Sequence, residues 1–131
     1  MSVIVPIGQQ ERYEAILQRG IAFAQDHDMT LIVLLSRSLT QYSQEQIDYD
    51  VDTLTDKLEQ ADVAFEIITR LDDTDLATTI RETALEHNAV LIITSLAPKP
   101  SHGSYQLGTQ VQKLLVDAPC EVLIMRDVIN T

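Results

Sequence analysis

Residues 31–35 read Leu31-Ile32-Val33-Leu34-Leu35, five apolar side chains with no polar residue between them. A strand with this pattern is apolar on both faces and must be covered on both, which is typical of a parallel sheet in an α/β domain. Four further short runs are largely apolar: Val3–Ile7, Val63–Thr69, Ala89–Thr94 and Glu121–Met125. The run at 63–69 carries Glu66 in its middle, so we expect that strand nearer an edge of the sheet.

The stretches between these runs have apolar residues at the spacing of an amphipathic helix. The four sets are Tyr13, Ile16, Leu17, Gly20 and Ala24; Ile47, Val51, Leu54, Leu58 and Ala61; Leu76, Ile80, Ala84 and His87; and Leu107, Val111, Leu114, Leu115 and Ala118. Right-handed crossovers then predict a three-layer α/β sandwich, with five parallel strands and four helices divided between the two faces. No linker divides the chain, and residues 1–131 are expected to form a single domain.

Several residues predict how the helices begin, end and approach the sheet. Thr74 or Asp75 can cap the third helix. Asn88 follows that helix and tolerates the left-handed backbone of a helix C-terminus. Pro119 would stop the fourth helix before the last strand. Gly20 lies on the first apolar stripe, so that helix can approach the sheet closely.

The composition argues against several classes of partner. The chain has 9 Lys and Arg against 20 Asp and Glu, a formal net charge of −11, which repels nucleic-acid phosphates and anionic membrane surfaces. No apolar run approaches the roughly 20 residues that span a bilayer, and the N-terminus lacks the basic segment of a signal peptide. Cys120 is the single cysteine, so no internal disulfide forms. We therefore expect a cytoplasmic protein that binds neither nucleic acid nor membrane.

The segment 107–126 reads Leu-Gly-Thr-Gln-Val-Gln-Lys-Leu-Leu-Val-Asp-Ala-Pro-Cys-Glu-Val-Leu-Ile-Met-Arg and resembles the C-terminal signature of the universal stress protein family. In that family a Gly-Ser or Gly-Thr opens the last helix, as Gly108-Thr109 does here, and an Ala-Pro-Cys turn leads into the last strand. Val3–Ile7 also resembles the family's first strand, and 76–93 its third helix and fourth strand. The resemblance implies an adenine nucleotide alpha hydrolase-like fold with strand order 3-2-1-4-5, and a homodimer through the last strand.

Nucleotide-binding members of that family carry the motif Gly-x2-Gly-x9-Gly-(Ser/Thr) between the fourth strand and the last helix. Counted back from Gly108-Thr109, the first two glycines fall on Ser95 and Pro98. Glycine can adopt a positive φ and bring its N–H close to a phosphate, whereas proline has no N–H. The family's ATP binders also keep an acidic residue after the first strand, where this chain has Gly8. The resemblance therefore implies a degenerate nucleotide site.

The implied pocket lies where the chain leaves the first, second and fourth strands, because open α/β sheets bind ligands at the carboxyl ends of their strands. Gly108-Thr109, at a helix N-terminus, can still attract a weakly held anion. A phosphate cradle shifted onto the loop at 101–104 is the alternative. The residues assigned to this weak or vestigial pocket are Pro6, Ile7, Gly8, Leu35, Ser36, Thr94, Ser95, Ser101, Gly103, Ser104, Gly108 and Thr109.

Catalytic and metal sites find little support in the sequence. It contains neither a Gly-x-Ser-x-Gly elbow nor a P-loop, and its histidines and cysteine lack metal-ligand spacing. The acidic run 72–75 is interpreted as a helix-capping turn, and the acids between 48 and 59 as a solvated helix face. Cys120 follows a turn proline and precedes an apolar strand, so we expect an inert core thiol.

We therefore expect a non-enzymatic stress-response or regulatory module that has no resident cofactor and does not bind ATP tightly. The alternative is a protein that binds ATP or another adenine nucleotide through the shifted loop. A more distant alternative is an adenine-nucleotide hydrolase. The identity of a ligand or protein partner stays open.

Overall fold

A computed structural model describes residues 1–7, 13–71, 75–98, 105–106 and 109–126, with the backbone alone for 96–98, 105–106, 109–110 and 126. In chain order the elements are β1 (Ser2–Ile7), α1 (Glu14–His27), β2 (Thr30–Ser36), α2 (Gln44–Gln60), β3 (Phe65–Arg70), α3 (Leu76–Glu86), β4 (Ala89–Pro98), β5 (Tyr105–Gln106), α4 (Thr109–Val116) and β6 (Glu121–Arg126).

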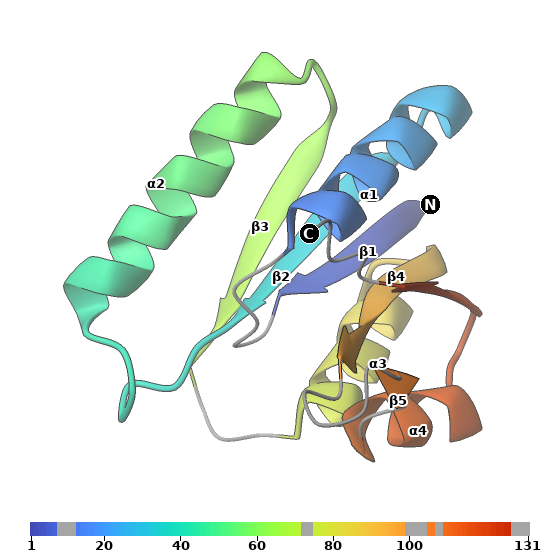
Figure 1. Ribbon diagram of the computed structural model, residues 1–131. Helices are drawn as coiled ribbons and strands as arrows, with labels where there is room; N and C mark the ends of the chain where they lie inside the picture. The colour runs from blue at the N-terminus through green and yellow to red at the C-terminus, as the bar shows by residue number, and fades with distance from the viewer. Residues whose placement is uncertain (8–12, 72–74, 99–104, 107–108, 127–131) are drawn as a thin grey trace.

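Five of the strands form a parallel sheet in the order β3-β2-β1-β4-β6. The helices α1 and α2 cover one face, and α3 and α4 cover the other (Figure 1). This arrangement confirms the predicted α/β sandwich, its four helices and its strand order 3-2-1-4-5, with β6 as the fifth parallel strand.

Alternating side chains explain why the central strands are apolar throughout. Along β1, Val3, Val5 and Ile7 belong to the core beneath α1 and α2, whereas Ile4 belongs to the core beneath α3 and α4. Along β2 the alternation repeats, with Ile32 facing the α3 and α4 side. Because a strand exposes successive side chains on opposite faces, a sheet covered twice requires apolar residues at nearly every position.

The first helix lies unusually close to the sheet at Gly20, as its sequence position predicts. A Cβ added at Gly20 would lie 2.5 Å from Cγ2 of Val5 and 3.1 Å from Cδ1 of Leu31. Real Cβ atoms do not tolerate the shorter of these distances. The absence of a side chain at Gly20 therefore sets the depth at which α1 packs on β1 and β2.

Three of the helices end in a residue with positive φ that is not glycine. Asp28 after α1, Asp62 after α2 and Asn88 after α3 have φ values of 53°, 55° and 52°. The prediction for Asn88 is confirmed, and the same solution recurs twice with aspartate. Asx residues are among the few that adopt this region readily, because their short polar side chains bond locally.

The C-terminal part differs from expectation in three respects. The strand β4 continues to Pro98, beyond the predicted end at Thr94, and its last two residues pair antiparallel with the two-residue β5. The helix α4 ends at Val116, three residues before Pro119. Leu115, predicted to lie on the buried stripe, is 43% exposed. Among residues 111–116 of this short helix, Leu114 is the one side chain that is turned fully toward the sheet.

Candidate functional site

The candidate site lies where the strand order reverses, between the carboxyl ends of β1 and β4. Pairing of β1 with β4 ends at Ile4 and Ile92, whereas pairing of β1 with β2 continues to Ile7 and Leu35. Past Ile4, the described pairing therefore joins β1 to β2 alone. Such a switch point is the usual place for a ligand in an open α/β sheet.

Six of the predicted site residues are described with their side chains, and the fold brings all six to this edge. Pro6 and Ile7 end β1, Leu35 and Ser36 end β2, and Thr94 and Ser95 lie on β4. Strand alternation divides them, since Pro6, Ser36 and Thr94 share the face of α3 and α4 with Ile4, Leu34 and Ile92, while the other three share the opposite face.

These six side chains differ in what they can offer a ligand. Ile7 and Leu35 are fully buried in the core beneath α1 and α2, so their side chains do not line an open surface at this edge. Thr94 is 9% exposed, and Ser36 and Ser95 are half-buried. The polar groups available at this edge are therefore mainly hydroxyls.

The remaining predicted residues lie at or beyond the limits of the description. Gly8, Ser101, Gly103, Ser104 and Gly108 fall outside the described residues. Thr109 is the first residue of α4, and the structure describes its backbone alone. The shifted-cradle alternative thus stays a prediction.

The backbone at the two altered glycine positions is part of a strand. Ser95 pairs with Met125 of β6, and Pro98 pairs with Tyr105 of β5. Proline at the end of a strand does not remove a hydrogen bond from the interior of the sheet, so β4 can extend to Pro98. The segment that would carry the first two motif glycines is therefore extended backbone.

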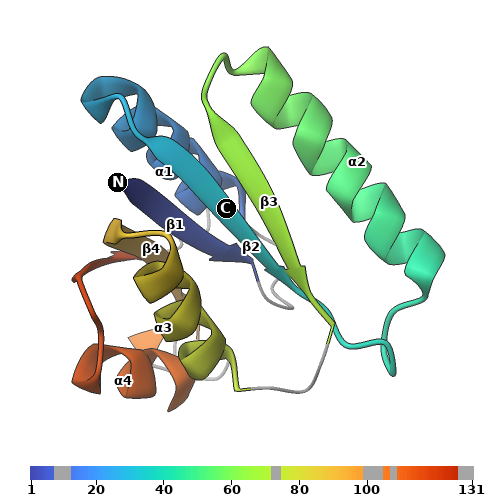
Figure 2. The ribbon, with the colours of Figure 1, turned by 180° about the vertical axis from the view of Figure 1, so that it is seen from behind.

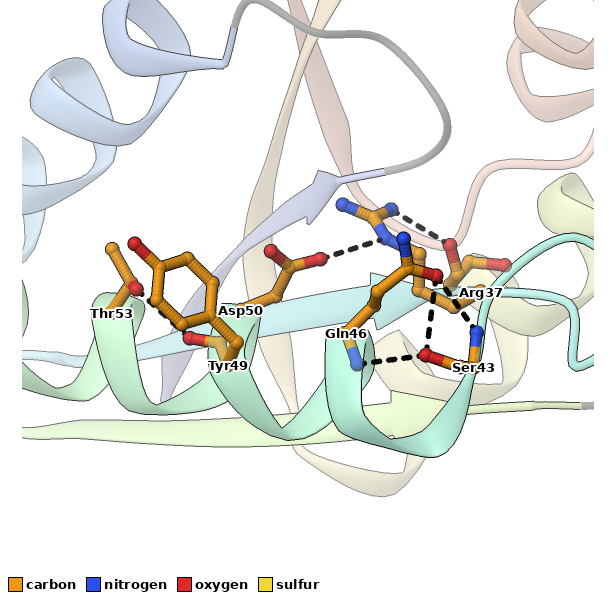
Figure 3. A network of polar contacts seen from close by, with 7 residues as sticks. Arg37, Ser43, Gln46, Tyr49, Asp50 and Thr53 are labelled. Atoms are coloured by element: carbon orange, nitrogen blue, oxygen red, sulfur yellow. Dashed lines mark hydrogen bonds and ion pairs between the residues drawn. The ribbon is translucent and has the colours of Figure 1, made fainter.

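A buried arginine that the sequence did not single out follows β2 directly. Arg37 is 8% exposed, and its Nη1 donates to the Ser36 carbonyl over 3.0 Å. Its Nε donates to Oδ2 of Asp50 on α2 over 3.4 Å (Figure 3). Its guanidinium lies 5.1 Å from the centre of the Tyr42 ring. The signal available in the sequence was a basic residue directly after an apolar strand in a strongly acidic chain.

The Arg37–Asp50 ion pair corrects the expectation that Asp50 belongs to a solvated face. Asp50 is half-buried against Arg37. The helix α2 begins with a capping box at Ser43, in which the Ser43 hydroxyl accepts from the Gln46 amide N–H and the Gln46 side chain accepts from the Ser43 N–H. This start orients the first turns of α2 so that Asp50 meets Arg37. An open hollow of about 570 Å³ beside it is lined by Tyr42, Ser43, Glu45, Gln46, Tyr49 and Asp50.

Cys120 lies half-buried against the core on the α3 and α4 side. Burial, and secondarily the negative charge of Glu121, raises the pKa of the Cys120 thiol. A raised pKa disfavours the reactive thiolate, in keeping with an unreactive thiol.

The described residues offer neither a metal-binding cluster nor a membrane-spanning helix. No group of three or more His, Cys, Asp or Glu residues among them is arranged to hold a metal ion. None of the helices in the described part of the chain has the length and apolarity needed to cross a membrane.

Comparison with solved structures finds universal stress proteins of the same fold. UspA from Lactobacillus plantarum is 17% identical with a TM-score of 0.71, covering 96% of this chain and 97% of that one. The Archaeoglobus fulgidus universal stress protein in complex with dAMP is 16% identical with a TM-score of 0.71, covering 95% and 96%. A universal stress protein in complex with cAMP is 16% identical with a TM-score of 0.74, covering 96% of each chain.

At these identities the structural likeness establishes the fold alone. Comparison with curated proteins finds no match. The sequence model of the universal stress protein family, however, matches residues 1–126, nearly the whole chain. With the strand order and the C-terminal signature described above, that match shows that the chain belongs to the universal stress protein family.

Proposed function

We propose that this chain is a non-enzymatic, cytoplasmic stress-response module that does not bind ATP tightly. The observation that carries the proposal is the extended backbone at Ser95 and Pro98, where nucleotide-binding members of the family have glycines. Extended backbone is the opposite of the tight, positive-φ turn that presents successive N–H groups to a phosphate.

The expected loss of affinity is large. Forcing a non-glycine residue into the left-handed region costs on the order of 1–2 kcal/mol, and each lost hydrogen bond to a charged group costs about 1.5–3 kcal/mol. Two such losses total roughly 3–5 kcal/mol, a weakening of a few hundred- to a few thousand-fold. The net charge of −11 also opposes an anionic ligand. A micromolar site would become a millimolar one.

Calorimetric titration with ATP and Mg²⁺ tests this proposal directly. We expect a dissociation constant of about 1 mM or weaker for the unmodified chain. The double variant Ser95→Gly/Pro98→Gly restores the motif and should bind at least about tenfold more tightly. Pro119→Gly, outside the motif, is the matched control and should leave the affinity unchanged.

The alternative function is adenine-nucleotide binding through the shifted loop. It is favoured by the relatives of the same fold that are in complex with dAMP and with cAMP. A dissociation constant near 10 µM or tighter for the unmodified chain would support it and refute the main proposal. In that case Gly103→Val should abolish binding while the fold persists, and ATP turnover above background would further identify an enzyme.

We also propose that the chain forms a homodimer through β6. The two edge strands of the sheet differ in how well they are protected from pairing with another chain. The strand β3 carries the exposed Glu66 in its middle, whereas β6 has four half-buried apolar residues at 122–125. Charges within an edge strand discourage pairing with another chain, and an unprotected apolar edge favours it. Among the described strands, β6 pairs with β4 alone.

Ile124→Lys is the variant that tests the dimer. Leu123 and Met125 pack against the core beneath α1, and Val122 against the core beneath α3, so changing them would also affect folding. Sedimentation should find a dimer for the unmodified chain and a monomer for Ile124→Lys, with Thr69→Lys on β3 as the matched control that stays dimeric. A monomeric unmodified chain at high micromolar concentration would contradict the proposal.

A further inference from the structure

The helix α4 is attached to the molecule by few buried side chains. Among residues 111–116, Leu114 alone is fully buried, at 3% exposure. Val116, at 88%, is among the most exposed apolar residues of the described chain. Burial of one leucine contributes little toward the conformational entropy lost in ordering a separate helix.

Two ion pairs join α4 to α3, which lies beside it (Figure 2). Arg81 Nη1 lies 2.6 Å from Asp117 Oδ2, just after α4. Lys113 Nζ lies 3.5 Å from Asp75 Oδ1, just before α3. All four side chains are between 31% and 69% exposed, so solvent ions reach both pairs.

A hollow lies beside these ion pairs, next to Leu114, which belongs to the same apolar core as Ala77 and Ile80 of α3. Its volume is about 180 Å³, and its lining includes all four charged residues together with Ala77, Thr78 and Leu114. Small and polar side chains on α3 therefore face α4 at this point. The described contacts between α4 and α3 thus combine the buried Leu114 with two exposed ion pairs.

From these contacts we infer that α4 responds to ionic strength. Added salt loosens α4 from α3, and the same salt stabilises the rest of the fold. Exposed ion pairs weaken as the Debye length falls from about 10 Å at 0.1 M salt to about 3 Å at 1 M. The same screening relieves the self-repulsion of a chain with net charge −11, which favours the compact state. The two effects have opposite signs, so they can be separated in one measurement. The inference is independent of the proposed function.

Hydrogen exchange at 0.05 M and 1 M NaCl provides that measurement. In the unmodified chain we expect the opening of α4, read from the amides of 113–116, to increase about three- to tenfold in high salt, as two exposed ion pairs allow. The amides of α1 should be unchanged or better protected.

The double variant Asp75→Asn/Asp117→Asn removes both ion pairs. Asp75 is the N-cap of α3 but makes no side-chain hydrogen bond to the helix backbone, so the change removes no cap bond, and asparagine keeps an oxygen that can accept from the Thr78 hydroxyl. Its α4 should open as readily in low salt as the unmodified helix does in high salt, and salt should add nothing. The matched control Asp26→Asn/Asp52→Asn changes two exposed acids elsewhere and shifts the net charge equally. It should keep the full response. The inference would be overturned if the hydrogen exchange of α4 changed in parallel with that of α1 between the two salt concentrations. It would also be overturned if α4 of Asp75→Asn/Asp117→Asn kept its response to salt.

Discussion

The first and last helices look alike in the sequence and are held very differently in the molecule. The sequence predicts a stripe of five residues at helical spacing for each, although Leu107 and Ala118 of the second stripe lie outside α4. The helix α1 buries Ile16, Leu17, Gly20, Ile21 and Ala24 against the central strands, whereas α4 fully buries Leu114 alone among its residues 111–116. The difference shows that hydrophobic periodicity predicts which face of a helix turns inward, while the depth of burial depends on where in the sheet the helix lands.

The largest expected effect comes from filling the space that lets α1 approach the sheet. Gly20→Val should lower the free energy of unfolding by about 3 kcal/mol or more, because even its Cβ would lie 2.5 Å from Cγ2 of Val5. Ala15→Val on the exposed face of α1 is the control and should cost less than about 1 kcal/mol of helix propensity. Urea unfolding followed by circular dichroism measures both. Similar losses for the two variants would refute the close approach.

The same leucine-to-alanine change in the two helices tests the comparison itself. Leu17→Ala should lower the global free energy of unfolding by about 2–5 kcal/mol, because it leaves a cavity in the main core. Leu114→Ala should lower it by less than about 2 kcal/mol, because α4 can open locally without the rest unfolding. In Leu114→Ala, the increase in hydrogen exchange should occur at the amides of α4. Equal global losses would mean that α4 is an integral part of the cooperative unit.

A smaller effect distinguishes the half-buried ion pair between Arg37 and α2 from the more exposed pairs at α4. Asp50→Asn removes the carboxylate from Arg37, which is 8% exposed, and should destabilise the fold by about 1–2 kcal/mol. Asp50 is 35% exposed, and solvent screening keeps the loss below that of a fully buried pair. Asp52→Asn, an exposed neighbour, should change stability by less than about 0.5 kcal/mol. Indistinguishable urea midpoints would show that Arg37 needs no partner on α2.

The location of the candidate site was predictable from the sequence, whereas the residues that form it were less so. The carboxyl ends of β1, β2 and β4 follow from the order of the elements, and Pro6, Ser36 and Thr94 do lie there. Arg37 and Asp50 did not emerge, because they are 13 residues apart and meet only through the turn and capping box between β2 and α2. The pairing of Pro98 with Tyr105 was missed for a similar reason, since a serine- and proline-rich stretch looks irregular until a partner strand lies beside it.

The sequence by itself determined the class of fold, the order of the helices and parallel strands along the chain, and the family, but not the short antiparallel β5. Those features depend on the spacing of apolar residues and on a local C-terminal motif, both of which are readable along the chain. Tertiary structure alone decided how deeply each helix is buried, which acid pairs with Arg37, and that two ion pairs join α4 to α3 beside a hollow. These features arise between residues distant in sequence, whose proximity depends on the packing of the whole sheet.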